Sequence, residues 1–249
     1  MTTLPVKLLK EPLVDVVFEF RFEGRESASS IIPGYLFAKL EGSDEIENLA
    51  ASRLPKEMRL SDPNLKFSPL VRLRWSGVVI SISDNSLIIG CNIPYPGWSD
   101  FKSNILKIVN HLSDIKIIDT VQRLSMKYVD LLEANSLQEQ ISLIDMSVKV
   151  GGHDLVDQKF SLRMEVEENN VISIFNIMSS ATTISNNGDQ KTGIIVDTDT
   201  IMNLPNFSFK KFLSDMPENL EILHAKNKEM FFECILQKTL INLEPVYDE

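Results

Sequence analysis

Residues 13–23 read LVDVVFEFRFE, and this stretch decides the fold. Val16, Phe18, Phe20 and Phe22 alternate with residues that are mostly charged. Because successive side chains of a β-strand point to opposite faces, this period of two predicts a long strand with one face in a core and the other mostly in water. If the strand lies at an exposed sheet edge, it can pair two copies of the chain, and symmetric dimers are the commonest soluble oligomers.

Three more strands are expected between residues 70 and 93, because turn-forming residues interrupt three apolar runs. The expected strands are residues 70–75, 78–83 and 87–93. Together they predict an antiparallel meander. A helix is expected from Ser99 or Asp100 to Leu112, since its apolar residues recur at helical spacing, and a shorter helix is expected near residues 33–40.

The second half of the chain also alternates strands with turns. Five strands are expected at residues 121–132, 141–150, 160–166, 171–178 and 193–200, with a polar loop over residues 179–193. A short helix is expected over residues 207–213. The last helix is expected from Pro217, which suits a first helical turn, to Ile241.

These elements predict an α+β fold in which helices cover one face of antiparallel β-meanders. Each half of the chain runs from strands to a helix, so we expect two similar lobes packed side by side, residues 1–115 and residues 116–249. A length of 249 residues also suits one large domain. No repeat of individual residues marks the halves as a duplication, and that question stays open.

The charge is unevenly distributed along the chain. The formal net charge is −10; residues 1–125 carry 15 basic and 15 acidic residues, whereas residues 126–249 carry 10 and 20. An acidic surface repels phosphate, which argues against nucleic-acid binding and favours a basic protein or peptide partner. Acidic surfaces also serve solubility alone.

The chain carries no signal for a membrane or an export route. It has no run of roughly 18–20 apolar residues, and its N-terminal sequence lacks the apolar block of a signal peptide. We therefore expect a cytoplasmic protein without membrane contact. Cys91 and Cys234 belong to no metal or redox spacing, so we expect buried free thiols.

The motifs of common catalytic and cofactor sites are missing from the sequence. No phosphate-binding glycine loop and no GxSxG motif occurs, and His111, His153 and His224 are not spaced as metal ligands. Asp197 and Asp199 share one strand face, as a cation site would require, but no third ligand is identifiable and an exposed polar face also explains them. We expect no catalytic residue, metal ion or cofactor.

One group of residues is a candidate ligand- or partner-binding site. Tyr95 and Trp98 flank a rigid Pro-Gly turn before the helix that ends at Leu112, and a neighbouring expected strand carries Arg123, Tyr128 and Asp130. Aromatic and arginine side chains dominate binding hot spots. The alternative is that the two aromatic residues of the turn only close one end of the core.

Four segments carry a resemblance to a known family. They are EPLVDVVFEFRFE at 11–23, YPGWSDF at 95–101, RLSMKYVDLLE at 123–133 and HAKNKEMFFECI at 224–235. In type, order and spacing they resemble a sporadically distributed, uncharacterised family of bacterial proteins of about this length. That family typically has an asparagine where this chain has Asp130. The resemblance implies a cytoplasmic bacterial or archaeal protein of patchy distribution, as accessory or genetic-conflict genes have, and it implies no established activity.

Two functions follow as the main hypotheses; a third, nucleic-acid binding, would need a basic stripe built from Arg21, Arg72, Arg74 and Lys102. The first is a non-enzymatic binding or interaction protein, a partner or sensor subunit in a bacterial accessory or conflict (defence) system, whose partner is another protein or a second copy of the chain. The alternative is an enzyme or small-molecule binder with a site between the two lobes, built from Arg123, Tyr128 and Asp130 with the aromatic turn. A deep pocket on which these side chains converge would favour the alternative.

Overall fold

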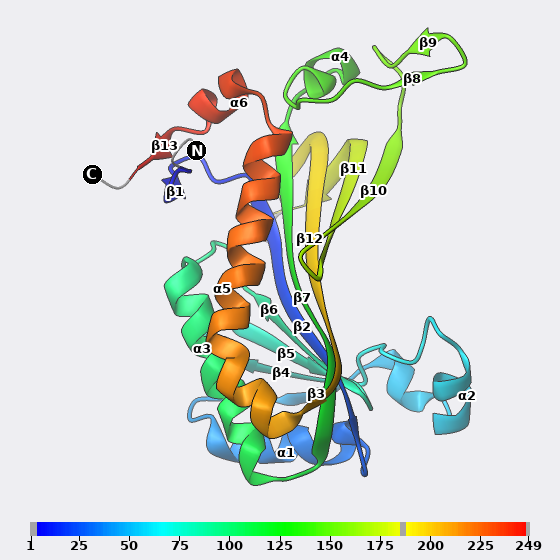
Figure 1. Ribbon diagram of the computed structural model, residues 1–249, viewed down its shortest axis with the longest axis vertical. Helices are drawn as coiled ribbons and strands as arrows, with labels where there is room; N and C mark the ends of the chain where they lie inside the picture. Colours follow the sequence, from blue (N-terminus) through cyan, green and yellow to red (C-terminus); the bar gives the residue numbers. More distant parts are fainter. Residues whose placement is uncertain (1–3, 185–187, 248–249) are drawn as a thin grey trace. The chain divides into compact units, whose positions relative to one another are not determined.

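The computed structural model of the protein describes residues 4–184 and 188–247, and its α+β class is the predicted one. Among these residues, hydrogen bonds join nine strands into one sheet (Figure 1). In order across the sheet, the strands are β10 (Ser161–Glu168), β11 (Val171–Ile184), β12 (Gln190–Ser208), β7 (Ile118–Glu133), β2 (Leu13–Gly24), β6 (Ser86–Cys91), β5 (Val78–Ile82), β4 (Val71–Trp75) and β3 (Ile46–Asn48).

The described part of the chain also contains six α-helices, two small strand pairs and two short 3₁₀ helices, Ala50–Arg53 and Leu112–Asp114. The helices are α1 (Ala28–Lys39), α2 (Lys56–Ser61), α3 (Trp98–His111), α4 (Leu137–Ile141), α5 (Phe209–Cys234) and α6 (Gln237–Asn242). The strand pairs are β1 (Lys7–Leu8) with β13 (Pro245–Val246), and β8 (Lys149–Val150) with β9 (His153–Asp154). None of these helices is long and apolar enough to cross a membrane.

The strand expected from LVDVVFEFRFE is β2, and its period of two is confirmed. Phe18, Phe20 and Phe22 are buried, whereas Glu19 on the opposite face stays partly exposed. β2 lies between β7 and β6 in the sheet. The prediction that two copies pair along this strand is therefore wrong, because neighbouring strands already occupy both sides of its backbone.

Contacts within the chain group its residues into two compact units. Unit 1 contains the described parts of Met1–Val14, Lys127–Thr200 and His224–Glu249, and unit 2 contains Asp15–Met126 and Ile201–Leu223. Four elements, β2, β7, β12 and α5, run from one unit into the other. Both units thus take residues from each side of the expected boundary at residue 115, and the division into two similar lobes stays a prediction.

The core of unit 2 forms around the phenylalanine face of β2. The ring of Phe20 lies 5.4 Å from that of Phe22 and 5.3 Å from that of Phe212 in α5. Helix α1 packs against β4 and β5. The expected meander is confirmed as β4, β5 and β6, paired in antiparallel register. Its first turn has Ser76 and Gly77 in the left-handed region, at φ of 47° and 76°.

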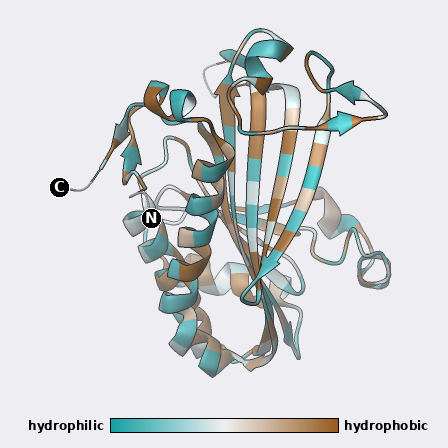
Figure 2. Cartoon of the chain, turned by 45° about the horizontal axis from the view of Figure 1, so that its top comes forward, coloured by the Kyte–Doolittle hydropathy of each residue, from teal (hydrophilic) through white to brown (hydrophobic). Residues whose placement is uncertain are grey.

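The core of unit 1 forms between the C-terminal part of α5 and three long strands. Its buried members include Leu132 of β7, Ile177 of β11, Ile194 and Val196 of β12, and Phe231 and Cys234 of α5. Figure 2 shows hydrophobic and hydrophilic residues alternating along the long strands, as the period of two predicts for strands with one covered face.

A predicted strand over residues 141–150 is wrong. The chain instead forms α4, a stretch without regular structure, and then the two-residue strand β8. Ser136 and Glu139 make a capping box, in which each side chain bonds the backbone N–H of the other residue. This pair starts the short helix, which ends where the predicted strand was to begin. The chain then turns at residues 142–143, and Ile144 makes an isolated bridge with Ile235.

Two more boundaries differ from the prediction. The polar loop expected over residues 179–193 is too long, because β11 continues to Ile184 and β12 begins at Gln190; residues 185–187 lie outside the described residues. The two helices expected after residue 207 form one helix, α5, with Pro217 inside it, and α6 is separate.

Gly193 lets two strands of unit 1 approach closely. A Cβ atom built on Gly193 of β12 would lie 2.1 Å from the carbonyl oxygen of Leu132 in β7. Backbone cannot move aside as a flexible side chain does. By contrast, a Cβ on Gly34 inside helix α1 would meet no atom within 4 Å.

We predict that G193A and G34A change stability in opposite directions. G193A should lower the free energy of unfolding by about 1–3 kcal/mol, as overpacking of a close contact does. G34A should raise it by roughly 0.5–1 kcal/mol, because alanine is the better helix former. Urea unfolding measured by circular dichroism tests both; a G193A protein as stable as the parent would contradict the close approach of β12 and β7.

A buried carboxylate, Asp84, ties three segments of unit 2 together. Arg59 of α2 donates to its Oδ2 atom at 2.7 Å and 3.2 Å, and the hydroxyls of Ser27 and Ser29 donate to its Oδ1 atom. The side chains of Asp84 and Arg59 are 4% and 11% exposed. Burial alone would raise the pKa of Asp84, but the hydrogen bonds and the charge of Arg59 bring this pKa below its ordinary value.

We predict that D84N destabilises the protein by about 3–5 kcal/mol at pH 7, because it leaves Arg59 buried without its counter-charge. A lowered folded-state pKa gives stability that is present above the unfolded pKa and is lost as the pH falls through the folded pKa. The difference between parent and variant should therefore shrink below about pH 4. Thermal unfolding from pH 7 to pH 2.5 measures this, and a pH-independent difference would contradict it.

Candidate functional site

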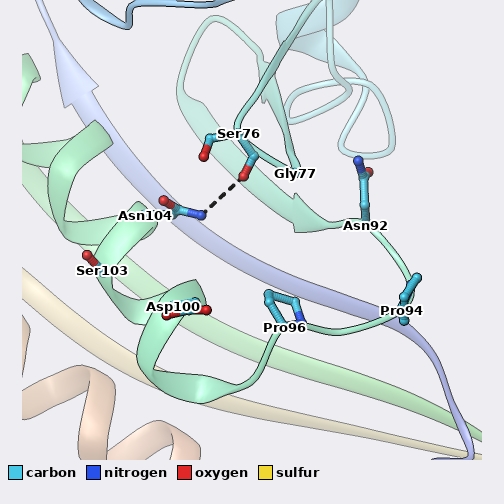
Figure 3. Close-up of a pocket in the computed structure, with 8 residues that line it drawn as sticks. All are labelled: Ser76, Gly77, Asn92, Pro94, Pro96, Asp100, Ser103 and Asn104. Atoms are coloured by element: carbon cyan, nitrogen blue, oxygen red, sulfur yellow. Dashed lines mark hydrogen bonds between the residues drawn. The ribbon is translucent and has the colours of Figure 1, made fainter.

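A pocket in unit 2 lies beside the turn that the sequence singled out. It has a volume of about 310 Å³ and is lined by Ser76, Gly77, Asn92, Pro94, Pro96, Asp100, Ser103 and Asn104. Figure 3 shows helix α3 on one side of this turn pocket and the two loops, after β4 and after β6, on the other. The turn pocket is thus built where three chain segments meet.

The helical side of the turn pocket follows from the spacing of α3. Asp100, Ser103 and Asn104 are three and four residues apart, so they lie on one helix face. The adjacent face is apolar and buried, with Phe101 and Ile105 among its members. Burial of that apolar stripe fixes the rotation of the helix and so turns the polar face toward the loops.

Hydrogen bonds hold the loops of the turn pocket in place. The backbone N–H of Asn92 donates to the carbonyl of Gly77 at 2.9 Å, which joins the end of β6 to the β4–β5 turn. The Nδ2 atom of Asn104 donates to the carbonyl of Ser76 at 3.4 Å, which joins the helix to the same turn. Contacts of this kind make the lining largely preformed.

The aromatic residues of the turn support the pocket and do not line it. Tyr95 is half-buried, and its ring packs edge-on against Phe101 at a centroid distance of 6.1 Å. The indole N–H of Trp98 lies 3.1 Å from Glu221 of α5, which also accepts from Lys102 at 2.6 Å. Pro96, between the two aromatic residues, is the member of the turn that reaches the pocket.

The other three candidate residues lie elsewhere. Arg123 is half-buried on the part of β7 that belongs to unit 2, whereas Tyr128 and Asp130 belong to unit 1. The hydroxyl of Tyr128 lies 3.1 Å from Nδ1 of His224 in α5, and the two rings are 5.8 Å apart. Tyr128 and Asp130 are two residues apart on β7, and their side chains share one face of the strand.

Asp130 is a buried carboxyl on β7, only 5% exposed. Burial raises its pKa well above the ordinary value, and the charge of Glu11 raises it further. Burial also raises the pKa of Glu11, against the opposing effect of Lys7. The proton therefore stays on Asp130 at pH values where an exposed aspartate has lost it.

The residues expected to be chemically inert or structural have partners that suit that role. Asp197 accepts from Lys127 at 2.8 Å and from Asn176 at 3.4 Å. Among the described residues, no three His, Cys, Asp or Glu side chains gather as metal ligands. Cys91 and Cys234 are free and buried, as predicted, and burial raises the pKa of each thiol to about 11. Thiols of such high pKa are poor nucleophiles at neutral pH.

Sequence reasoning located the turn but missed the polar residues that line the pocket. The spacing of Asp100, Ser103 and Asn104 beside the apolar stripe was the signal for the helical side. Nothing local in the sequence places Ser76 next to Asn92, because they are brought together by the pairing of β4, β5 and β6.

We predict that D130N stabilises the protein at neutral pH. A raised folded-state pKa gives stability that is full below the unfolded pKa, near 4, and is lost as the pH rises through the folded pKa. The amide is neutral at every pH, so the variant should gain about 1 kcal/mol or more at pH 7 and nothing at pH 3. Urea unfolding at both pH values measures the gain, and a variant less stable at pH 7 would contradict a protonated Asp130.

Comparison with known proteins adds no family. A scan against protein-family models finds no match for the chain, and a search of the curated proteins finds none either. The resemblance to a sporadically distributed bacterial family stays a prediction.

Proposed function

We propose that the protein is a non-enzymatic interaction protein, and that its turn pocket receives a basic side chain of a protein partner. The observation that carries the proposal is the chemistry of the lining. Asp100 offers a carboxylate, Asn92 and Asn104 offer amide oxygens, and Ser76 and Ser103 offer hydroxyl oxygens. Among the described residues that line the pocket, none is a lysine or an arginine.

The size of the turn pocket supports a single side chain as its occupant. Its volume of about 310 Å³ is at the lower end of the roughly 300–1,000 Å³ typical of ligand sites. An ammonium or guanidinium group donates several hydrogen bonds and accepts none, so it needs acceptors in several directions. A second positive charge in the pocket would repel it. Acceptors on both the helix and the loops meet that requirement.

Charge supports the same kind of partner. The net charge of −10 arises from residues 126–249, so the attraction at the turn pocket comes from the carboxylate of Asp100 itself, which acts over about a Debye length. The two basic side chains near the pocket are occupied, since Lys102 bonds Glu221 and the ammonium of Lys107 lies 4.8 Å from the centre of the Trp75 ring. Both lysines are therefore held by groups other than Asp100.

Two other functions that the sequence suggested remain proposals. A role as partner or sensor subunit in a bacterial accessory or defence system rests on the resemblance alone. An enzyme or small-molecule binder using Arg123, Tyr128 and Asp130 would need these residues in one pocket, and they do not line the turn pocket.

We predict that the full chain binds a lysine-containing peptide at the turn pocket. The probes are two capped tripeptides, Gly-Lys-Gly and Gly-Glu-Gly, titrated into ¹⁵N-labelled protein. The lysine peptide should shift the amide signals of Gly77, Asn92 and Asn104, and the glutamate peptide should not. D100N should weaken the binding about tenfold, because a hydrogen bond to a charged group contributes about 1.5–3 kcal/mol.

The matched control is D44N, which makes the same change of charge at an exposed loop residue of the same unit. It should leave the titration unchanged. Equal binding of both peptides, or equal loss of binding in D44N and D100N, would overturn the role of the pocket. In cells, we expect a protein partner to co-purify with the parent and with D44N in equal amount. It should not co-purify with D100N.

A further inference from the structure

Strand β10 of unit 1 stands at the end of the sheet, independently of the turn pocket. It pairs with β11 in antiparallel register from Ser161 opposite Met178 to Glu168 opposite Val171. In the described part of the chain, no strand pairs with its other side. Six of its eight residues are exposed, and Met164 is 47% exposed. An edge strand of this length is a template for a further strand.

The direction of its backbone groups follows from one hydrogen bond. The carbonyl of Phe160, just before β10, accepts from the N–H of Ser179 at 3.1 Å, so residue 160 points its backbone toward β11. Because this direction alternates along a strand, the even-numbered residues of β10 face β11. The odd-numbered residues Ser161, Arg163, Glu165 and Glu167 therefore turn their N–H and C=O groups outward.

Only certain registers allow two copies of β10 to pair by a twofold axis. The outward residues are all odd-numbered, so an antiparallel partner must place odd residues opposite odd residues. A register centred on Met164 pairs seven residues, 161–167, and sets Arg163 of each copy opposite Glu165 of the other. A register centred one residue earlier sets Arg163 opposite Arg163. A register centred one residue later sets Glu165 opposite Glu165 at the axis, while Arg163 lies opposite Glu167.

The opposite face of the strand fits the same register. Leu162, Met164 and Val166 form an apolar row on the face that packs toward the unit 1 core, where Leu162 contacts the buried cluster. In the register centred on Met164, Leu162 of one copy lies opposite Val166 of the other, and the two Met164 side chains meet at the axis. Apolar and oppositely charged cross-strand pairs both stabilise antiparallel sheets.

We propose that the protein forms a homodimer through antiparallel pairing of β10 with β10, centred on Met164. Each copy supplies the same strand, so the interface is self-complementary, as a twofold dimer requires. Within one chain, Arg163 already bonds Glu165 at 2.5 Å and Asn176 at 3.1 Å. In the dimer each Glu165 gains a second guanidinium from across the axis.

The test is a set of charge reversals followed by sedimentation equilibrium of the full chain. The parent should have twice the 28.2 kDa of one chain. R163E sets glutamates opposite each other, and E165R sets arginines opposite each other, so each variant should dimerise at least tenfold more weakly. The double variant R163E/E165R restores both pairs and should dimerise like the parent. A mixture of the two single variants should form the mixed dimer.

The control E218R makes the same charge reversal on an exposed residue of α5 and should leave the dimer intact. A parent that stays at 28.2 kDa at every concentration overturns the proposal. So does a dimer that both single reversals leave unchanged, or one that E218R dissociates equally, because its contacts would then lie elsewhere or be unspecific.

A cysteine cross-link tests the register separately. Residues directly opposite at a non-hydrogen-bonded position have Cα atoms about 4.5 Å apart, within the range that a disulfide spans. M164C should therefore give a covalent dimer on mild oxidation. V166C lies on the same face but opposite Leu162 and should not. A cross-link in V166C and none in M164C overturns the register.

Discussion

The apolar face of β2 is the constraint on which unit 2 depends. Phe18, Phe20 and Phe22 project from one side of a single strand, and burying three such rings requires cover over most of the strand's length. Phe212 at the start of α5 packs on the ring of Phe20. The backbone N–H and C=O groups of β2 pair with β7 on one side and with β6 on the other. The strand therefore lies inside the sheet and has no open edge.

In unit 1 the same helix is held by polar groups as well as apolar ones. The side chains of Thr198 and Asn227 are buried, and Asn227 accepts from the Thr198 hydroxyl at 2.7 Å and donates to the Thr198 carbonyl at 2.8 Å. A buried amide without partners is costly, so this pair fixes where α5 sits along β12 more sharply than apolar packing alone. The apolar cluster around Phe231 and Cys234 then supplies most of the stabilising burial.

Sequence periodicity predicted what depends on local pattern. It located β2, the β4–β6 meander and the apolar stripe of α3, because each buries one face of a regular element. It failed at residues 141–150, where the chain turns after the capped helix and Ile144 bridges Ile235, a distant contact that no local pattern predicts. The same distinction holds for the candidate site. The local sequence predicted the turn, but Ser76 lies near Asn92 because β4, β5 and β6 pair with one another.

The sequence of the edge strand β10 favours one register against β11 and one register against a second copy of β10. Leu162, Met164 and Val166 form an apolar row on one face, and a slip of one residue against β11 would move them to the opposite face. Its odd-numbered residues direct their backbone N–H and C=O groups away from β11, and their side chains, three of which are charged, lie on the sheet face opposite the apolar row. Charges on an edge strand ordinarily discourage pairing. In the register centred on Met164, each Arg163 lies opposite a Glu165 and no like charges meet. Each neighbouring register places like charges at the axis, Arg163 opposite Arg163 or Glu165 opposite Glu165, although the later one also pairs Arg163 with Glu167, so discrimination rests on repulsion as well as attraction.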